Sequence, residues 1–166
     1  NRAIVAALPM LEEWRGKLQI IHQSGEQDYE ETVQGYRDNN WPDVEVTPFI
    51  KDMVGAYAKS TLIVCRAGAT TLAELTACGR PAILVPYPYA AAGHQSTNAM
   101  AMAARGAAMT MEEADLTPER LATLVSGLLH DRTSIKTMAS AARGLARRGA
   151  AARLLQECRA VLDEAI

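Results

Sequence analysis

One segment of the sequence combines small residues, hydroxyl groups and a carboxylate at a spacing that suits an anionic ligand. The segment CRAGATTLAE at residues 65–74 is typical of a buried strand, a small-residue turn and the start of a helix. Gly68 and Ala69 allow close approach to the backbone, and the N–H groups of residues 69–71 would face an anion such as a diphosphate. Glu74 can accept two hydrogen bonds from a vicinal diol such as a ribose. An ordinary strand-to-helix turn with a solvated Glu74 fits this pattern equally well.

A second segment, PYPYAAAGHQ at residues 86–95, follows the next predicted strand. Its prolines stiffen the entry to the loop, while alanine and glycine leave room beyond. His94 and Gln95 would then stand at the start of a helix, with imidazole and amide donors that suit sugar hydroxyls or phosphate. Spacing alone slightly favours a simple helix cap at Gln95 and a surface histidine. With no serine or aspartate partner nearby in the sequence, His94 does not indicate a catalytic triad.

Two further strand ends carry weaker signals. Backbone groups at Phe49 and Ile50 could pair with the edge of a base, although two core residues explain the pattern equally well. The HQSG sequence at 22–25 is more simply a polar loop with a glycine turn. The three histidines share no metal-ligand spacing, so no metal site is expected.

Alternating strands and helices must position these segments. Apolar runs predict strands at 18–22, 44–49, 62–65, 82–85 and 107–111. Helical periodicity predicts helices at 2–14 with a kink at Pro9, 27–38, 51–58, 70–77, 95–104, 118–130, 133–147 and 150–165. This order predicts an α/β fold, a Rossmann-like open parallel sheet with helices on both faces. Ligands of such sheets bind at the carboxyl ends of the strands, where all of the segments above would lie.

Composition excludes several classes of protein. The 166 residues are 49% hydrophobic and 22% charged, which fits one globular domain rather than a disordered chain. The net charge of -2 gives no reason to expect a nucleic-acid partner. Three widely spaced cysteines do not suggest a disulfide scaffold or a thiolate zinc site. No uninterrupted apolar run approaches the roughly 18–20 residues that span a bilayer.

Five ordered motifs resemble the C-terminal half of the MurG family of bacterial N-acetylglucosaminyltransferases, which belong to glycosyltransferase family 28. The motifs are HQSG at 22–25, VTPFI at 46–50, CRAGATTLAEL at 65–75, GRPAILVPYP at 79–88 and HQxxN at 94–98. The resemblance extends over essentially the whole chain and is densest between residues 44 and 106. It implies a GT-B fold in which residues 1–166 form the donor-binding domain, as a C-terminal piece of a two-domain enzyme.

The resemblance also implies an activity. The family transfers N-acetylglucosamine from UDP-N-acetylglucosamine to lipid I, with inversion at the anomeric carbon, and forms lipid II for peptidoglycan, cell shape and cell division. No cofactor and no metal are implied. The expected location is peripheral, at the cytoplasmic face of the bacterial inner membrane. The alternatives are a GT-B transferase that uses another UDP-sugar, and a non-catalytic donor-binding subunit of a split glycosyltransferase.

Roles of individual residues follow from the resemblance. The backbone N–H and C=O of Ile50 are expected to meet the uracil edge, and Glu74 is expected to hold the ribose hydroxyls. Ala69 and Thr70, at a helix N-terminus, are expected to face the diphosphate.

The sugar end of the site is implied in the same way. His94 and Gln95 are expected to reach the hydroxyls of N-acetylglucosamine. Arg66 borders the same pocket, where it would either order the loops or contact the nucleotide. Gly93 departs from the family pattern, which often has an acidic or amide residue there.

Two parts of the family pattern do not appear in the sequence. One is a glycine-rich GGSQG turn expected shortly before Asn1, and the other is the N-terminal domain that supplies the acceptor site and the candidate general base. No catalytic residue is therefore expected among residues 1–166. The isolated chain is expected to bind the donor weakly and not to catalyse transfer.

Overall fold

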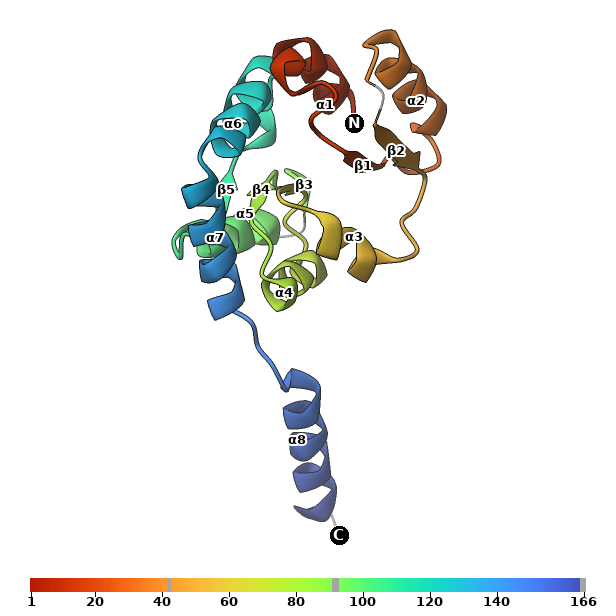
Figure 1. Ribbon diagram of the computed structural model, residues 1–166. Coiled ribbons are helices and arrows are strands. Elements are labelled where there is room, and N and C mark those ends of the chain that lie inside the picture. The colour runs from red at the N-terminus through yellow and green to blue at the C-terminus, as the bar shows by residue number, and fades with distance from the viewer. Residues whose placement is uncertain (42, 91–92, 165–166) are drawn as a thin grey trace.

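The computed structural model describes residues 1–41, 43–90 and 93–164. Helices and strands alternate along the chain as the sequence predicts (Figure 1). Two parts of the sequence predictions, residues 91–92 of the 86–95 loop and residue 165 of the last helix, lie outside the described residues.

All strand pairs in the described residues are parallel. The strands are β1 (Ile20–Gln23), β2 (Val44–Thr47), β3 (Ile63–Cys65), β4 (Ala82–Leu84) and β5 (Ala108–Thr110). The register places Gln23 opposite Thr47, and it places Cys65 opposite Leu84, which in turn lies opposite Thr110. Within each sheet the strands therefore end at one edge, and the predicted ligand loops leave from that edge.

The hydrogen-bonded ladder of the described residues has two parts, β1-β2 and β3-β4-β5, where the sequence predicts one open sheet. The two parts share a core, because Val64 of β3 packs in the same apolar cluster as Ile20 and Val44. Hydrophobic period and chain order predict parallel crossovers. They do not say which strands become hydrogen-bonded neighbours, and that pairing is decided by the tertiary structure.

The first predicted helix is divided at its proline. An α-helix, α1 (Arg2–Ala7), is followed directly by a 3-10 helix, η1 (Leu8–Trp14). Pro9 has no N–H for an α-helical hydrogen bond, and its ring clashes with the carbonyl four residues earlier. The helix changes from α to 3-10 beside Pro9, but the kink itself lies two residues later, at Leu11, with φ −102° and ψ 18°, so its predicted position is corrected by two residues.

The remaining helices begin and end close to the predicted positions. They are α2 (Tyr29–Asp38), α3 (Met53–Lys59), α4 (Ala69–Cys78), α5 (His94–Ala103), α6 (Pro118–His130), α7 (Arg132–Gly144) and α8 (Ala150–Glu164). A short 3-10 helix, η3 (Glu113–Asp115), is an addition that the sequence pattern does not predict. Local chemistry sets two of these ends. The Thr117 side chain accepts from Arg120 N at the start of α6, and Gly79 ends α4 in the left-handed region at φ 61°.

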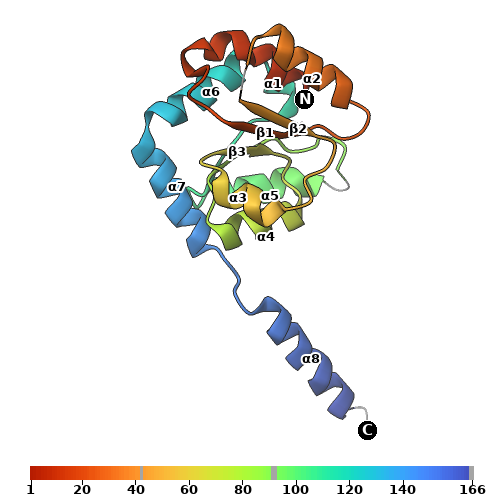
Figure 2. The ribbon, with the colours of Figure 1, turned by 45° about the vertical axis from the view of Figure 1, so that its right-hand side comes forward.

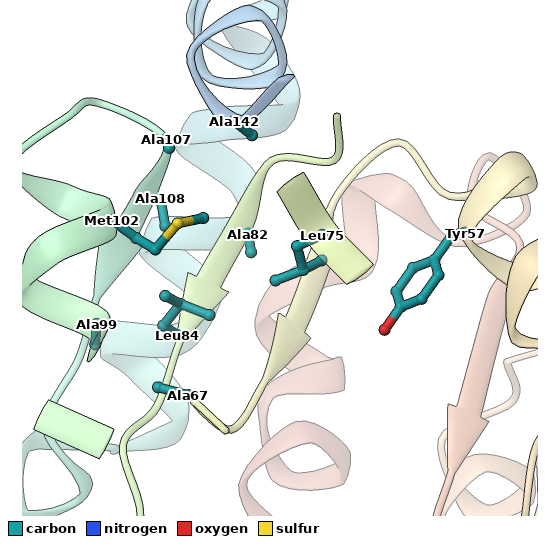
Figure 3. Close-up of a cluster of buried hydrophobic side chains, with 10 residues drawn as sticks. All are labelled: Tyr57, Ala67, Leu75, Ala82, Leu84, Ala99, Met102, Ala107, Ala108 and Ala142. Atoms are coloured by element: carbon teal, nitrogen blue, oxygen red, sulfur yellow. The ribbon is translucent and has the colours of Figure 1, made fainter. Parts of the chain in front are cut away.

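Helices cover the strands on both faces, as predicted. Figure 2 shows α1, α2 and α6 on one side and α3, α4 and α5 on the other. Alternate residues of β4 point to opposite faces. Ala82 and Leu84 join the cluster of Figure 3, whereas Ile83 packs with Leu128 of α6 and Ile135 of α7.

The last helix, α8, extends away from the body of the molecule (Figures 1 and 2). Its large apolar side chains Leu154, Leu155, Val161 and Leu162 are all exposed. Within the described residues, no helix combines the length and the apolar character needed to cross a membrane.

Candidate functional site

The N-terminus of α4 has the backbone geometry of an anion site. Gly68 precedes the helix in an extended conformation, with φ −66° and ψ 143°, and its carbonyl accepts the first helical hydrogen bond from Leu72 N at 3.0 Å. The N–H groups of residues 69–71 therefore have no acceptor within the helix. Ala69 and Thr70 are exposed, so these donors stand at the surface. A phosphate oxygen is the ligand that this end of a helix favours.

Glu74 lies on the same face of α4 as Thr70, four residues earlier. It is half-buried, and the Tyr57 hydroxyl donates a hydrogen bond to Glu74 Oε2 at 2.8 Å. The side chain of Glu74 is therefore held by a partner instead of extending freely into solvent. The hydrogen-bonded carboxylate of Glu74 therefore lies about one helical turn beyond the N–H groups at the start of α4.

Gln95 connects two loops at the carboxyl edge of the sheet. Its Oε1 accepts hydrogen bonds from Ala67 N at 3.2 Å and from Tyr87 N at 3.0 Å. One turn along α5, Asn98 Nδ2 donates to Ala67 O at 3.1 Å. These bonds fix α5 against the turn that begins α4. The amide oxygen of Gln95 is thereby occupied, and its NH₂ group remains the part of the side chain that can donate to a ligand.

Arg66 holds the loop after β4. Its Nη1 donates to Val85 O at 3.4 Å and Pro86 O at 3.2 Å, and it pairs with Glu113. The guanidinium also lies over the Tyr87 ring, 5.4 Å from the centroid. Of the two roles considered for Arg66, these contacts match the ordering of loops.

The backbone N–H of Ile50, expected to meet a base, already has a partner. It donates to Gln23 Oε1 at 2.9 Å, across the carboxyl ends of β1 and β2. Gln23 is exposed, so its side chain can turn away into solvent. A base that uses the Ile50 N–H must therefore replace the Gln23 amide oxygen.

The histidines differ in environment. His94 is exposed at the first residue of α5, directly after Gly93, whose φ of 63° is left-handed. His22 is buried rather than part of a polar loop: its Nδ1 lies 2.9 Å from Tyr36 Oη and its Nε2 lies 3.0 Å from Asn1 Oδ1. Burial lowers the pKa of His22 to about 4, so its ring is neutral at pH 7.

The predicted site residues form two groups. Hydrogen bonds and shared turns bring together those around the β3–α4 turn and the start of α5, which are Arg66, Ala69, Thr70, Glu74, His94 and Gln95. Ile50 lies after β2 in the other sheet, and no hydrogen bond between described residues joins it to α4 or α5. Helix α3 connects the groups, because it starts just after Ile50 and carries Tyr57 to Glu74.

Sequence reasoning missed the residues that hold the site in place. Tyr57, Gln23 and Glu113 are separated from their partners by 17, 27 and 47 residues. Signals existed for two of them: Gln23 belongs to the HQSG motif at the end of a strand, and a tyrosine at a core position of a helix needs a partner for its hydroxyl. The identity of that partner is not contained in any local pattern.

Two hollows of the surface lie away from the predicted site residues. One, of 340 Å³, lies between α1 and α2 and is lined in part by Arg2, Asp28 and Glu31. Another, of 400 Å³, lies beside α6 near Met10 and His130. Neither is lined by a predicted site residue. The described residues also contain no group of three or more histidine, cysteine, aspartate or glutamate side chains placed to hold a metal ion.

Comparison with known proteins decides the family. A match to the family described as "Glycosyltransferase family 28 C-terminal domain" extends over residues 1–154. The chain belongs to glycosyltransferase family 28. Its α/β fold with parallel strands matches that of a solved family member, the crystal structure of Acinetobacter baumannii MurG, with a TM-score of 0.81 and 36% identity over 93% of this chain and 45% of that one.

Two bacterial relatives of this chain share the name UDP-N-acetylglucosamine–N-acetylmuramyl-(pentapeptide) pyrophosphoryl-undecaprenol N-acetylglucosamine transferase. The protein from Syntrophotalea carbinolica is 52% identical over 99% of this chain and 46% of its own length. The protein from Geobacter sulfurreducens is 43% identical over 95% of this chain and 43% of its own length. The chain thus spans slightly less than half the length of these curated relatives.

A more distant structure shares the fold alone. The glycosyltransferase VinC, crystallised with dTDP, is 20% identical over 84% of this chain and has a TM-score of 0.64. At this identity the likeness concerns the arrangement of helices and strands, and not the ligand.

Proposed function

We propose that this chain is the donor-binding, C-terminal domain of an inverting hexosyltransferase. The observation that carries the proposal is the exposed N-terminus of α4, with Thr70 and the held Glu74 on one face of the helix. The two features suit the diphosphate and the ribose of a nucleotide-sugar. They stand in a chain 52% identical to a protein named as an N-acetylglucosamine transferase.

The proposed substrates follow from the names of the relatives. The donor is UDP-N-acetylglucosamine, the acceptor is lipid I, and the product is lipid II. Ile50 would take the uracil edge, Glu74 the ribose, and Ala69 and Thr70 the diphosphate. The enzyme would work at the cytoplasmic face of the bacterial inner membrane as a peripheral protein.

Residues at the start of α5 would bind the sugar of the donor. His94 and the NH₂ group of Gln95 would donate to the hydroxyls of N-acetylglucosamine, while Arg66 orders the loop that carries Tyr87. Gln95 supports this role because its oxygen is fixed by two backbone N–H groups, which sets the direction of its NH₂ group.

The chemistry of transfer follows from the charge on the leaving group. Negative charge develops on UDP as the glycosidic bond breaks, and fixed N–H dipoles at the α4 N-terminus stabilise it without reorganising. The acceptor hydroxyl must lose a proton, and the base for that step would belong to another domain.

Titration of the chain with UDP-N-acetylglucosamine and with UDP, followed by two-dimensional amide NMR, tests the proposal. Selective shifts are expected at Ile50, at residues 69–74 and at His94 and Gln95. TDP-glucose is the control nucleotide, for which weaker shifts are expected. Shifts at other residues, or a preference for TDP-glucose, would contradict the proposed site.

If no amide shifts at millimolar nucleotide, either the chain lacks part of the donor site or the proposed function is wrong. A titration of a second, longer protein distinguishes these two explanations. The titration is repeated on a chain extended at its N-terminus to include a preceding strand and glycine-rich turn. Binding by the extended chain alone would support the proposed donor site and assign part of the diphosphate contact to the added turn. No binding by either chain would overturn the proposed function.

A further inference from the structure

A buried tyrosine contacts the glutamate of the predicted ribose site. Tyr57 of α3 is 5% exposed and belongs to the apolar cluster that contains Ala67, Leu75 and Leu84. Figure 3 shows its ring with the hydroxyl directed inward, away from α3. The ring alone would complete this cluster, and a phenylalanine would do so without a polar atom to satisfy. The hydroxyl therefore needs an explanation of its own.

The explanation is the carboxylate of Glu74. Tyr57 Oη donates to Glu74 Oε2 at 2.8 Å, an ordinary distance for an O–H···O hydrogen bond. Burial, and then the hydrogen bond to Glu74, raise the pKa of Tyr57, so the phenol keeps its proton and remains a donor. The bond restrains a glutamate whose long side chain would otherwise sample several rotamers at the half-buried surface of α4.

The bond leaves the rest of the carboxylate available. A carboxylate has about four acceptor positions on its two oxygens, and Tyr57 uses one of them. Oε1 and the second position of Oε2 remain for two further donors. Two neighbouring hydroxyls are the group that matches such a pair of acceptors, provided that the plane of the carboxylate is fixed in advance.

We propose that Tyr57 is a positioning residue that fixes the carboxylate of Glu74 for a vicinal diol, and so makes the site selective for ribonucleotides over 2′-deoxyribonucleotides. The inference rests on the proposed function, in which Glu74 binds the ribose of a uridine nucleotide. Tyr57 itself does not touch the ligand. It acts through the direction in which the Glu74 oxygens point.

Binding of UDP and of 2′-deoxy-UDP to the complete enzyme that contains this chain tests the proposal by calorimetry. Tyr57→Phe removes only the hydroxyl. We expect it to weaken UDP binding about three- to tenfold and 2′-deoxy-UDP binding less, because a single hydrogen bond tolerates a misdirected carboxylate better than a paired one. The ratio of the two affinities should fall toward one. In the reaction, KM for the donor should rise while kcat changes little.

Tyr36→Phe is the matched control. Tyr36 of α2 is also a buried tyrosine, with 3% of its surface exposed. Its hydroxyl, however, is hydrogen-bonded to His22 of β1 and not to Glu74. Each variant removes one hydrogen bond made by the hydroxyl of a buried tyrosine, so a loss of thermal stability is expected for both. Only Tyr57→Phe should change the ratio of UDP to 2′-deoxy-UDP affinity. If Tyr57→Phe does not fold, Tyr57→Met supplies an adaptable apolar side chain without a donor for the same comparison.

The double variant separates positioning from packing. In a Glu74→Ala background Tyr57→Phe should have no further effect on UDP affinity, because the carboxylate that it orients is gone. Equal weakening in both backgrounds, or equal weakening for both nucleotides, would overturn the role of Tyr57. If Glu74→Ala itself leaves UDP affinity unchanged, the proposed function fails first. If Glu74→Ala weakens UDP binding and Tyr57→Phe does not, the positioning role alone fails.

Discussion

Glu74 is the single side chain on which the proposed donor site depends most. In the complete enzyme, Glu74→Ala removes two hydrogen bonds to a charged group and should weaken donor binding by about 1.5–3 kcal/mol. KM for UDP-N-acetylglucosamine should therefore rise about ten- to 150-fold. Glu45→Ala, at an exposed position of β2, is the control and should leave KM unchanged. An unchanged KM in Glu74→Ala would refute the ribose role.

Gln23 competes with a base for the Ile50 N–H. Gln23→Ala removes the acceptor found 2.9 Å from that nitrogen and should strengthen UDP binding by about 0.5–1.5 kcal/mol, because no protein hydrogen bond has to break first. Calorimetric titration of the complete enzyme measures this gain. Gln34→Ala, an exposed glutamine on α2 that bonds to Asp38, should have no effect. Weaker UDP binding by Gln23→Ala would mean that Gln23 contributes to the site instead of occupying it.

His22 makes the stability of the fold depend on pH. Its pKa in the folded chain is about 4, below the ordinary value of 6.5, because burial disfavours the charged ring. Between these values the unfolded chain binds more protons, so the free energy of unfolding decreases as pH falls. Stability is full above about pH 6.5 and should drop by up to about 3 kcal/mol on the way to pH 4.

Urea unfolding of the chain between pH 4 and pH 8 measures this dependence. His22→Gln keeps hydrogen-bonding groups and does not titrate, so its unfolding free energy should vary less with pH than that of the unaltered chain. Parallel pH profiles for the two proteins would show that His22 is not the group responsible.

At the scale of the elements, Gly79 determines where α4 ends. Its φ of 61° is left-handed, and a Cβ added there would lie 2.7 Å from Arg143 Nε of α7. Gly79→Ala should therefore lower the free energy of unfolding by about 1–2 kcal/mol, mostly through backbone strain, since the Arg143 side chain can move.

Substitution of a second glycine, Gly127, is expected to raise the stability of the fold instead of lowering it. Gly127 lies inside α6 with a helical backbone, and an added Cβ would meet no atom within 4 Å. Gly127→Ala should raise the free energy of unfolding by about 0.5–1 kcal/mol, because alanine loses less backbone freedom in a helix. Urea midpoints of the two variants should move in opposite directions. A shift in the same direction would contradict the assignment of Gly79 as a left-handed helix end.

At the scale of the whole molecule, α8 is separate from the core. All its described side chains from residue 150 to residue 162 are exposed, and the apolar clusters are formed by other elements. A chain that ends at Arg148 should therefore keep its unfolding midpoint within about 2 °C of the 166-residue chain. Thermal unfolding followed by circular dichroism measures both. A clear loss of stability would show that α8 packs on the body of the chain in solution.

The sequence by itself determined the alternating elements, the break in the first helix near Pro9, the caps at Gly79 and Thr117, and the strand ends at which to look for a ligand. These features depend on residues close together along the chain, where hydrophobic period and local hydrogen bonding act directly. The motif at residues 65–74 likewise predicts the position of the proposed anion site, because the helix N-terminus and Glu74 belong to one continuous segment.

Only the tertiary structure decided how the sheet pairs and what holds the site. The ladder forms as β1-β2 and β3-β4-β5, Tyr57 meets Glu74, Gln23 takes the Ile50 N–H, and His22 is buried. Each contact joins residues on different elements of the chain, separated by 14, 17 or 27 positions in the sequence. Its partner is chosen by the packing of the whole chain, in which a buried polar group must find whichever acceptor or donor the fold brings near.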